Sequence, residues 1–173
     1  MNKVLFFLLI TASAYCSPLL EVKGGYFNFS NSKLRKIYTG GGLDLQLAVS
    51  YEIDPIWNVY ASAEYAQRSG NSLGAHERTR IELYPLSVGI KPTICLHPNF
   101  SFYGNVGPRY FFVNQRNYSE FVDKRVHQNG LGGFVGVGYS FRRLHFYPFK
   151  TYVTGHTIEV GGYTFGLGAG YSF

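Results

Sequence analysis

The sequence predicts an all-β fold, an eight-stranded antiparallel up-and-down transmembrane β-barrel at residues 17–173. Residues 163–173 alternate strictly between apolar and small side chains, and neither face carries a charge. Such a strand suits a narrow barrel whose outer wall meets lipid. Seven further segments also alternate, and the 173-residue chain contains 15 Tyr, 15 Phe and 1 Trp. Aromatic rings in such excess are typical of the two membrane–water interfaces.

The N-terminal segment predicts export. An apolar run at Val4–Ile10 follows Lys3 and precedes several small residues, which is the pattern of a secretory signal peptide at 1–16. Cleavage after Ala14 and cleavage after Cys16 both fit. The run is too short for a membrane-spanning helix, which needs roughly 20 apolar residues.

The two cysteines leave two interpretations open. If cleavage follows Ala14, Cys16 and Cys95 can form a disulfide, because export favours oxidation. Otherwise Cys95 is an inert residue near the end of a strand.

Three strands are predicted in the first part of the chain. The strand at 20–29 has a charged inner face and is followed by a polar, basic loop at 31–40 that ends in glycines. The strand at 43–53 has six apolar positions facing outward. A short turn at Asp54–Pro55 leads to the third strand at 57–68.

Two longer loops separate the next strands. A polar loop is expected at 69–79, before the fourth strand at 80–94. Two apolar residues ahead of Pro85 break the alternation of this strand, which indicates a β-bulge. The fifth strand is expected at 100–112, and the longest loop follows at 116–129.

The last three strands, at 135–141, 144–153 and 163–173, complete a count of eight. Four connections are longer and polar, and three are short. The short ones lie around Asp54–Pro55, His97–Pro98 and Arg142–Arg143. Short periplasmic turns and long outer loops are typical of barrels in the bacterial outer membrane.

Placing the short turns in the periplasm sorts the aromatic residues into two belts. The periplasmic belt contains Tyr51, Trp57, Phe100, Phe102, Tyr139, Phe141, Tyr171 and Phe173. The outer belt contains Tyr26, Tyr65, Tyr84, Tyr110, Phe112, Tyr152 and Tyr163. The strands are assigned without reference to these rings, so the belts support the barrel independently.

Several motifs resemble those of the small eight-stranded outer-membrane barrels of the OmpW/OmpX type. They are Val22-Lys-Gly-Gly-Tyr-Phe-Asn-Phe, Ile37-Tyr38 with the glycines after it, Tyr84-Pro85-Leu-Ser-Val-Gly89-Ile-Lys, Gly161-Gly162 and Tyr171-Ser172-Phe173. The similarity spans essentially the whole mature chain. In that family the terminal aromatic residue is the signal read by the barrel assembly machinery, so the resemblance implies this role and this partner for Phe173. It implies activities as diverse as adhesion, resistance to host defence and passage of small hydrophobic solutes.

A polar network in the lumen is the first candidate site. Its predicted members are Glu21, Lys23, Asp44, Glu52, Glu64, Arg68, Lys91 and Arg109. An eight-stranded barrel is just wide enough to be filled by its own side chains, and unpaired charges there are costly. We therefore expect these charges to pair across the lumen rather than to line a conducting pore.

A basic surface on the outer loops is the second candidate site. Its predicted members are Lys33, Arg35, Lys36, Arg78, Arg80, Arg116, Lys124 and Arg125. With a formal net charge of +6, the chain suits phosphates of lipopolysaccharide or anionic host glycans. A solvated rim that binds nothing is the alternative. No nucleic-acid partner is expected, because an exported chain meets lipid and glycan first.

No catalytic, cofactor or metal site is predicted. His156 and Thr157 are similar to the His–Ser arrangement of a barrel family that deacylates lipid A, but Ile158 stands where the nucleophile is needed. The glycine-rich runs at 132–138 and 166–170 lack the following helix of a dinucleotide-binding loop. No cluster of cysteine and histidine has metal-binding spacing.

The sequence therefore predicts an integral outer-membrane protein that is not an enzyme and has a structural or surface-interaction, adhesin-like role. Its expected partners are outer-membrane lipid and lipopolysaccharide, the assembly machinery, and a host-surface glycan or protein. A narrow channel for small hydrophobic solutes is the main alternative, ahead of a lipid-modifying barrel enzyme. A secreted lipocalin-like carrier would need the opposite orientation, with Leu45, Val59 and Leu167 enclosed.

Overall fold

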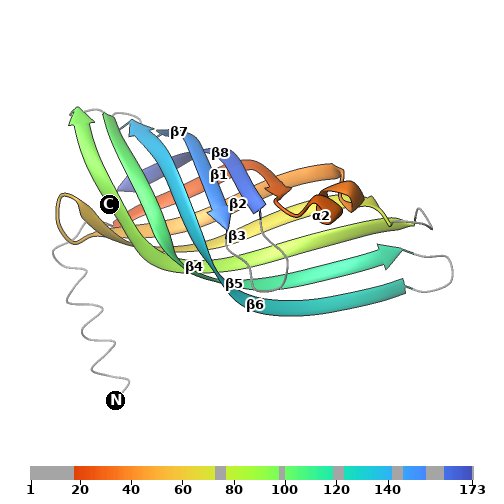
Figure 1. Cartoon of the computed structure of the whole chain (residues 1–173). Helices are drawn as coiled ribbons and strands as arrows, with labels where there is room; N and C mark the ends of the chain where they lie inside the picture. The colour runs from red at the N-terminus through yellow and green to blue at the C-terminus, as the bar shows by residue number, and fades with distance from the viewer. Residues whose placement is uncertain are drawn as a thin grey trace, which may run out of the picture.

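The computed structural model describes residues 18–72, 77–97, 100–118, 123–141, 146–154 and 162–172 (Figure 1). Within them, eight antiparallel strands pair in sequence order, and the pairing of β1 with β8 closes the barrel. The strands are β1 (Pro18–Phe29), β2 (Gly40–Glu52), β3 (Trp57–Asn71), β4 (Arg78–His97), β5 (Phe100–Tyr118), β6 (Asp123–Phe141), β7 (Phe146–Thr154) and β8 (Gly162–Ser172). The predicted all-β up-and-down fold is confirmed.

The apolar side chains face outward, as predicted. Leu45, Val59 and Leu167 are 48%, 45% and 61% exposed, whereas Gln46 on the opposite face of β2 is 2% exposed. The outward positions of β1, β4, β5 and β6 are similarly apolar, so the described part of the wall carries a hydrophobic band. Such a band is stable in lipid and not in water. This orientation excludes the lipocalin-like carrier.

Aromatic rings gather at both edges of this band. At one edge the ring centroids of Tyr110 and Phe112 are 4.9 Å apart, and those of Tyr65 and Tyr84 are 5.3 Å apart. At the other edge Tyr139 contacts Phe100 at 5.5 Å and Phe102 at 5.4 Å. Phe173 lies outside the described residues, as do the side chains of Phe141 and Tyr152.

Close strand approach explains the small inner face of β8. Gly25 on β1 pairs with Gly166 on β8. A Cβ atom on either glycine would lie under 3.0 Å from the backbone of the other strand. Glycine therefore lets the closing pair of strands pack tightly inside the narrow barrel.

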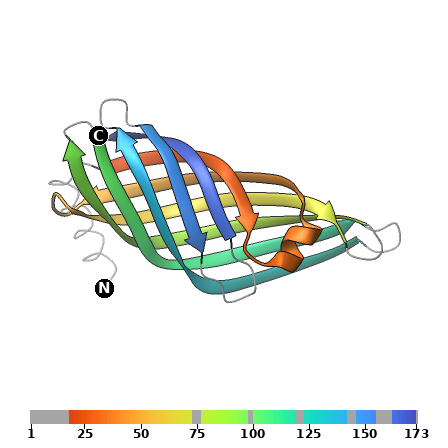
Figure 2. The same cartoon turned by 45° about the horizontal axis from the view of Figure 1, so that its top comes forward.

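A short helix, α2 (Ser32–Ile37), replaces the loop expected at 31–40. The Asn31 side chain caps its first turn by accepting hydrogen bonds from the backbone N–H groups of Lys33 and Leu34, at 2.9 and 3.4 Å. Leu34 and Ile37 then pack on a buried apolar cluster of the barrel. Figure 2 shows α2 at one end of the barrel, and the C-terminal end of β8 at the other. Among the described residues, no helix has the length and apolar character needed to cross a bilayer.

Most of the loop expected at 116–129 and both ends of the loop expected at 69–79, residues 69–71 and 78–79, are strand. β5 and β6 stay paired out to Tyr118 and Asp123, and β4 pairs with β5 from Arg78 onward. β3, β4, β5 and β6 therefore extend past the other strands at this end of the barrel (Figure 1). Polar residues occupy both faces there, so the alternation that reveals a membrane strand is missing.

The bulge expected at Pro85 is absent, because the register between β3 and β4 is unchanged on both sides of it. Ile81, Leu83 and Pro85 are all buried and continue the inward row of β4. The apparent break in alternation arises because the lumen is apolar at this height. In β4 the register shifts instead between Cys95 and His97.

Candidate functional site

Glu21 forms the centre of the buried charge network. Its carboxylate accepts hydrogen bonds from the ammonium groups of Lys23 at 3.1 Å and Lys91 at 2.8 Å. Odd-numbered residues of β1 and β4 point inward, which brings all three side chains into the lumen. Because β1 and β4 are not neighbouring strands, the bond to Lys91 crosses the barrel interior.

A second buried ion pair joins β3 to β5. The guanidinium of Arg109 donates to Glu64 at 3.0 Å and to the hydroxyl of Ser87 at 2.7 Å. Gln46 donates to Glu64 at 3.3 Å and to Ser62 at 3.1 Å. Each carboxylate thus has several donors, as buried charges require.

Aromatic rings fill the space around these charges. The ammonium groups of Lys23 and Lys91 lie 5.6 and 4.7 Å from the ring centroid of Tyr103. The Arg109 guanidinium lies 5.0 Å from the ring of Phe134. These contacts are within cation–π range, and they make this layer of the lumen a packed core.

A separate apolar layer lies between the charge network and α2. Its buried members are Phe27, Phe29, Tyr38, Ala66, Ile81, Leu83, Phe111 and Val113, with Leu34 and Ile37 of α2 packed on them. The lumen is therefore filled at two heights, by charged side chains and by apolar ones.

Arg68 was predicted in the charge network, but its hydrogen bonds hold α2 instead. Its guanidinium donates to the backbone carbonyls of Tyr38 at 2.8 and 3.2 Å and of Phe27 at 2.9 Å. It also donates to the hydroxyl of Tyr26 at 2.7 Å. Arg68 thus fastens the C-terminal end of α2 to the barrel.

Of two other residues predicted to face the lumen, Asp44 is buried and Glu52 is exposed. Asp44 is buried on β2, 3% exposed. Glu52 is exposed at the end of β2, where Tyr51 and Ile53 on either side of it are exposed as well. Its predicted place in the lumen is wrong, because Glu52 is exposed and lies beyond Tyr51, which forms the last described pair of β2 with β1.

The predicted basic residues fall into two groups. Lys33, Arg35 and Lys36 are exposed on α2. Arg78, Arg80, Arg116 and Arg125 lie on the extensions of β4, β5 and β6 rather than on loops. The side chain of Lys124 is outside the described part of the chain.

The cross-strand row of Arg80, Arg116 and Arg125 could not be seen in the sequence. Arg80 pairs with Arg116 across β4 and β5, and Arg116 pairs with Arg125 across β5 and β6. Sequence separation hides such a row, because it depends on strand register.

The remaining candidates are possible metal ligands, the cysteines and the His156–Thr157 pair, and none of them forms a site among the described residues. Within the described ranges, no three potential metal-ligating side chains gather. Cys95 is exposed, with its sulfur 3.7 Å from the hydroxyl oxygen of Ser101. The signal segment 1–16 with Cys16 and the His156–Thr157 pair both lie outside the described residues.

No protein-family model and no curated protein matches the sequence. Solved structures do match. Ail, the attachment invasion locus protein of Yersinia pestis in complex with the heparin analogue sucrose octasulfate, matches with a TM-score of 0.57 and 19% identity, over 91% of this chain and 97% of Ail. A major outer membrane protein of Thermus thermophilus matches with 0.58 and 15% identity, over 91% and 99%. Neisserial surface protein A matches with 0.54 and 12% identity, over 91% and 97%.

These similarities are in fold. Each of the three proteins aligns along nearly its whole length, so the match covers the complete barrel and not a fragment of sheet. The fold and the apolar outer band together make this protein a small β-barrel of the bacterial outer membrane.

Proposed function

We propose that this barrel is a surface-interaction protein, adhesin-like and without catalytic activity, that binds polyanionic glycans through α2. One observation carries the proposal. The helix turns Leu34 and Ile37 into the barrel and leaves Lys33, Arg35 and Lys36 exposed at its outer end. A fixed group of cations at this position suits sulfate or carboxylate groups on another surface.

The structural neighbour Ail supports the same class of ligand. It carries the name attachment invasion locus protein and binds a heparin analogue, a highly sulfated sugar. A closer relation to the OmpW/OmpX type, with its adhesive members, is part of this proposal.

The filled lumen favours surface interaction over a narrow channel. A solute would have to pass both the apolar layer under α2 and the Glu21–Lys23–Lys91 cluster. Hydrogen bonds of Arg68 hold α2 in place over the apolar layer, and buried ion pairs hold the charged layer together.

Binding of immobilised heparin by the purified barrel tests the proposal. The variant K33Q/R35Q/K36Q removes three charges and should weaken binding roughly tenfold at low salt, since exposed ion pairs contribute about 0.2–1 kcal/mol each. Raising the ionic strength should weaken wild-type binding in the same direction.

The charge-preserving variant K33R/R35K/K36R is the matched control and should bind as the wild type does. Heat-modifiable migration on a gel verifies that each variant is a folded barrel. Equal heparin binding by wild type and K33Q/R35Q/K36Q would rule out the helix as the binding surface.

Two further expectations remain predictions. Phe173 should act as the signal for the barrel assembly machinery, and the signal peptide should end after Ala14 or Cys16. N-terminal sequencing of the mature protein distinguishes the two cleavage sites.

A further inference from the structure

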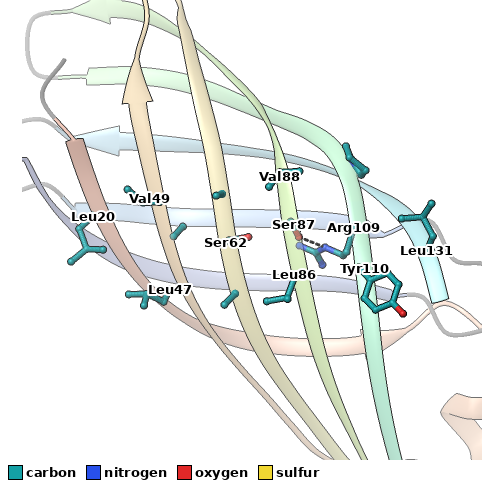
Figure 3. Close-up of a pocket in the computed structure, with 14 residues that line it drawn as sticks. Leu20, Leu47, Val49, Ser62, Leu86, Ser87, Val88, Arg109, Tyr110 and Leu131 are labelled. Carbon is teal, nitrogen blue, oxygen red and sulfur yellow. Dashed lines mark hydrogen bonds between the residues drawn. The ribbon is translucent and has the colours of Figure 1, made fainter. Parts of the chain in front are cut away.

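The strand extensions beyond the outer aromatic belt carry an inward-facing row of Gly70, Thr79 and Asn117. Gly70 pairs with Thr79 across β3 and β4, and Thr79 pairs with Asn117 across β4 and β5. Figure 3 shows part of such a row lower in the barrel, where the Arg109 guanidinium donates a hydrogen bond to Ser87 on the inner face of the wall. Thr79 and Asn117 lie eight residues farther along β4 and β5, which is an even number, so they continue the same inner face.

Gly70 is the point at which the end of α2 touches β3. A Cβ atom on Gly70 would collide with the carbonyl group of Ile37 and with the Cα atom of Tyr38. Both are backbone groups, so they cannot turn away as the end of a flexible side chain could. The helix therefore reaches its place on the barrel because residue 70 has no side chain.

Thr79 holds Tyr38, the residue that follows α2. The hydroxyl oxygens of Tyr38 and Thr79 are 3.4 Å apart, and both residues are 1% exposed. The Thr79 hydroxyl has one proton, and its shortest contact is with the side-chain oxygen of Asn117 at 2.6 Å. Because Thr79 donates that proton to Asn117, Tyr38 is the donor in the bond to Thr79. The row therefore fixes the hydroxyl end of Tyr38 in a buried position.

The contacts of this row are made by uncharged groups, whereas the cations of α2 are free to meet a ligand. Lys33, Arg35 and Lys36 are exposed on a helix of six residues. A helix of this length has little stability of its own, so the relative positions of its cations depend on the groups that hold it. A rigid group of cations binds a polyanion at a smaller cost in conformational entropy than a mobile group does.

We propose, on the basis of the glycan binding proposed above, that Gly70, Thr79 and Asn117 form a clamp that positions α2 and so sets its affinity for sulfated glycans. The three are positioning residues, because they carry no charge and act through the helix. Arg68 acts beside the clamp, since it donates to the carbonyl group of Tyr38 from the same strand as Gly70. The strand extensions thereby have a role in ligand binding without contacting the ligand.

Binding of a heparin tetrasaccharide and of long-chain heparin by the purified barrel, together with hydrogen exchange of residues 32–38, tests the clamp. Gly70→Ala displaces the end of the helix without removing a charge, so it should lower tetrasaccharide affinity roughly three- to tenfold. The loss for long-chain heparin should be smaller, because a long chain can follow displaced cations and a short one cannot. Exchange in 32–38 should accelerate. Tyr38→Phe, which removes the bond to Thr79, should change affinity and exchange in the same direction but by less.

Each variant has a matched control. Gly133→Ala is the control for the glycine, because a Cβ atom on Gly133 would lie 3.5 Å from the nearest atom, which is an ordinary contact. Tyr118→Phe is the control for the tyrosine, because Tyr118 is exposed on β5. Both controls should bind the tetrasaccharide and exchange as the wild type does. Heat-modifiable migration on a gel verifies that every variant is a folded barrel.

The charge variant K33Q/R35Q/K36Q, measured in parallel, separates the clamp from the glycan binding on which it rests. Wild-type tetrasaccharide affinity in Gly70→Ala, with weakened binding by the charge variant, would overturn the clamp and leave the glycan binding in place. Equal binding by the wild type and the charge variant would instead overturn the glycan binding. The exchange rate of 32–38 in Gly70→Ala then decides whether the row holds α2, and an unchanged rate would overturn the clamp as well.

Discussion

At the scale of single residues, Glu21 is unusual because one carboxylate forms two buried ion pairs. It is fully buried, and it is the carboxylate that two buried lysines share. Removing one partner of a buried ion pair leaves an uncompensated charge, which costs more than the pair itself contributes. Here the loss would leave two ammonium groups facing the same space.

We therefore predict that Glu21→Gln lowers the free energy of unfolding by about 3–5 kcal/mol. Urea unfolding of the barrel in lipid vesicles measures this difference. Glu52→Gln is the control, because Glu52 is exposed, and it should change stability by no more than about 0.5 kcal/mol. Similar stability of the two variants would show that the buried cluster contributes nothing to the fold.

Alternation in the sequence was enough to place most of the charged side chains in the lumen. Glu21, Lys23, Glu64, Lys91 and Arg109 are buried where the two-residue period puts them. The period does not say where a strand leaves the barrel, which is why Glu52 was misplaced. Nor does it give the partner of a side chain, and so the role of Arg68 at α2 was not predicted.

At the scale of elements, α2 depends on Arg68. Three nitrogen atoms of this guanidinium donate to two carbonyl groups and one hydroxyl near the helix end. The helix has only six residues, so it is too short to be stable without such contacts.

We predict that Arg68→Gln exposes the amides of 32–38 to solvent. Hydrogen bonds from a charged donor contribute about 1.5–3 kcal/mol, so hydrogen exchange in this segment should accelerate by roughly 10- to 100-fold. Mass spectrometry of peptides covering 32–38 reports the rate. Arg80→Gln, a similar change at an arginine that bonds to Gln67 and Glu82, should leave that rate unaltered.

Elements outside the membrane were harder to predict than those inside it. The capping residue Asn31 and the three-residue spacing of Leu34 and Ile37 are helix signals. In a helix of only six residues, these signals are too few to distinguish the segment from a loop. The extended ends of β4, β5 and β6 have polar residues on both faces, so water solvates either side. Only pairing with the neighbouring strand shows that they continue the sheet.

At the scale of the whole molecule, register decides which distant residues meet. The row of Arg80, Arg116 and Arg125 joins three strands, and local shifts such as that between Gly41 and Leu43 change which residues are opposite. The sequence predicts the number of strands and their faces, because lipid on one side and a narrow interior on the other impose them. Register depends on turn geometry and bulges, which leave weaker signals.

Closure of the lumen is also a property of the whole barrel. The apolar layer under α2 and the charged layer around Glu21 are built from different residues at different heights. Each layer spans an interior that is just wide enough for side chains. Either layer alone should therefore be sufficient to stop ions.

We predict that the wild-type protein shows no conductance steps in a planar lipid bilayer. The variant F27A/F29A/F111A, which truncates the apolar layer, should stay silent, as should E21A/K23A/K91A, since each retains one layer. Combining both changes should produce ion conductance, provided that heat-modifiable migration shows a folded barrel. Discrete steps from the wild type would favour the channel instead. Silence of the folded combined variant would show that a further constriction, such as the Glu64–Arg109 pair, closes the lumen, contrary to the two-layer account.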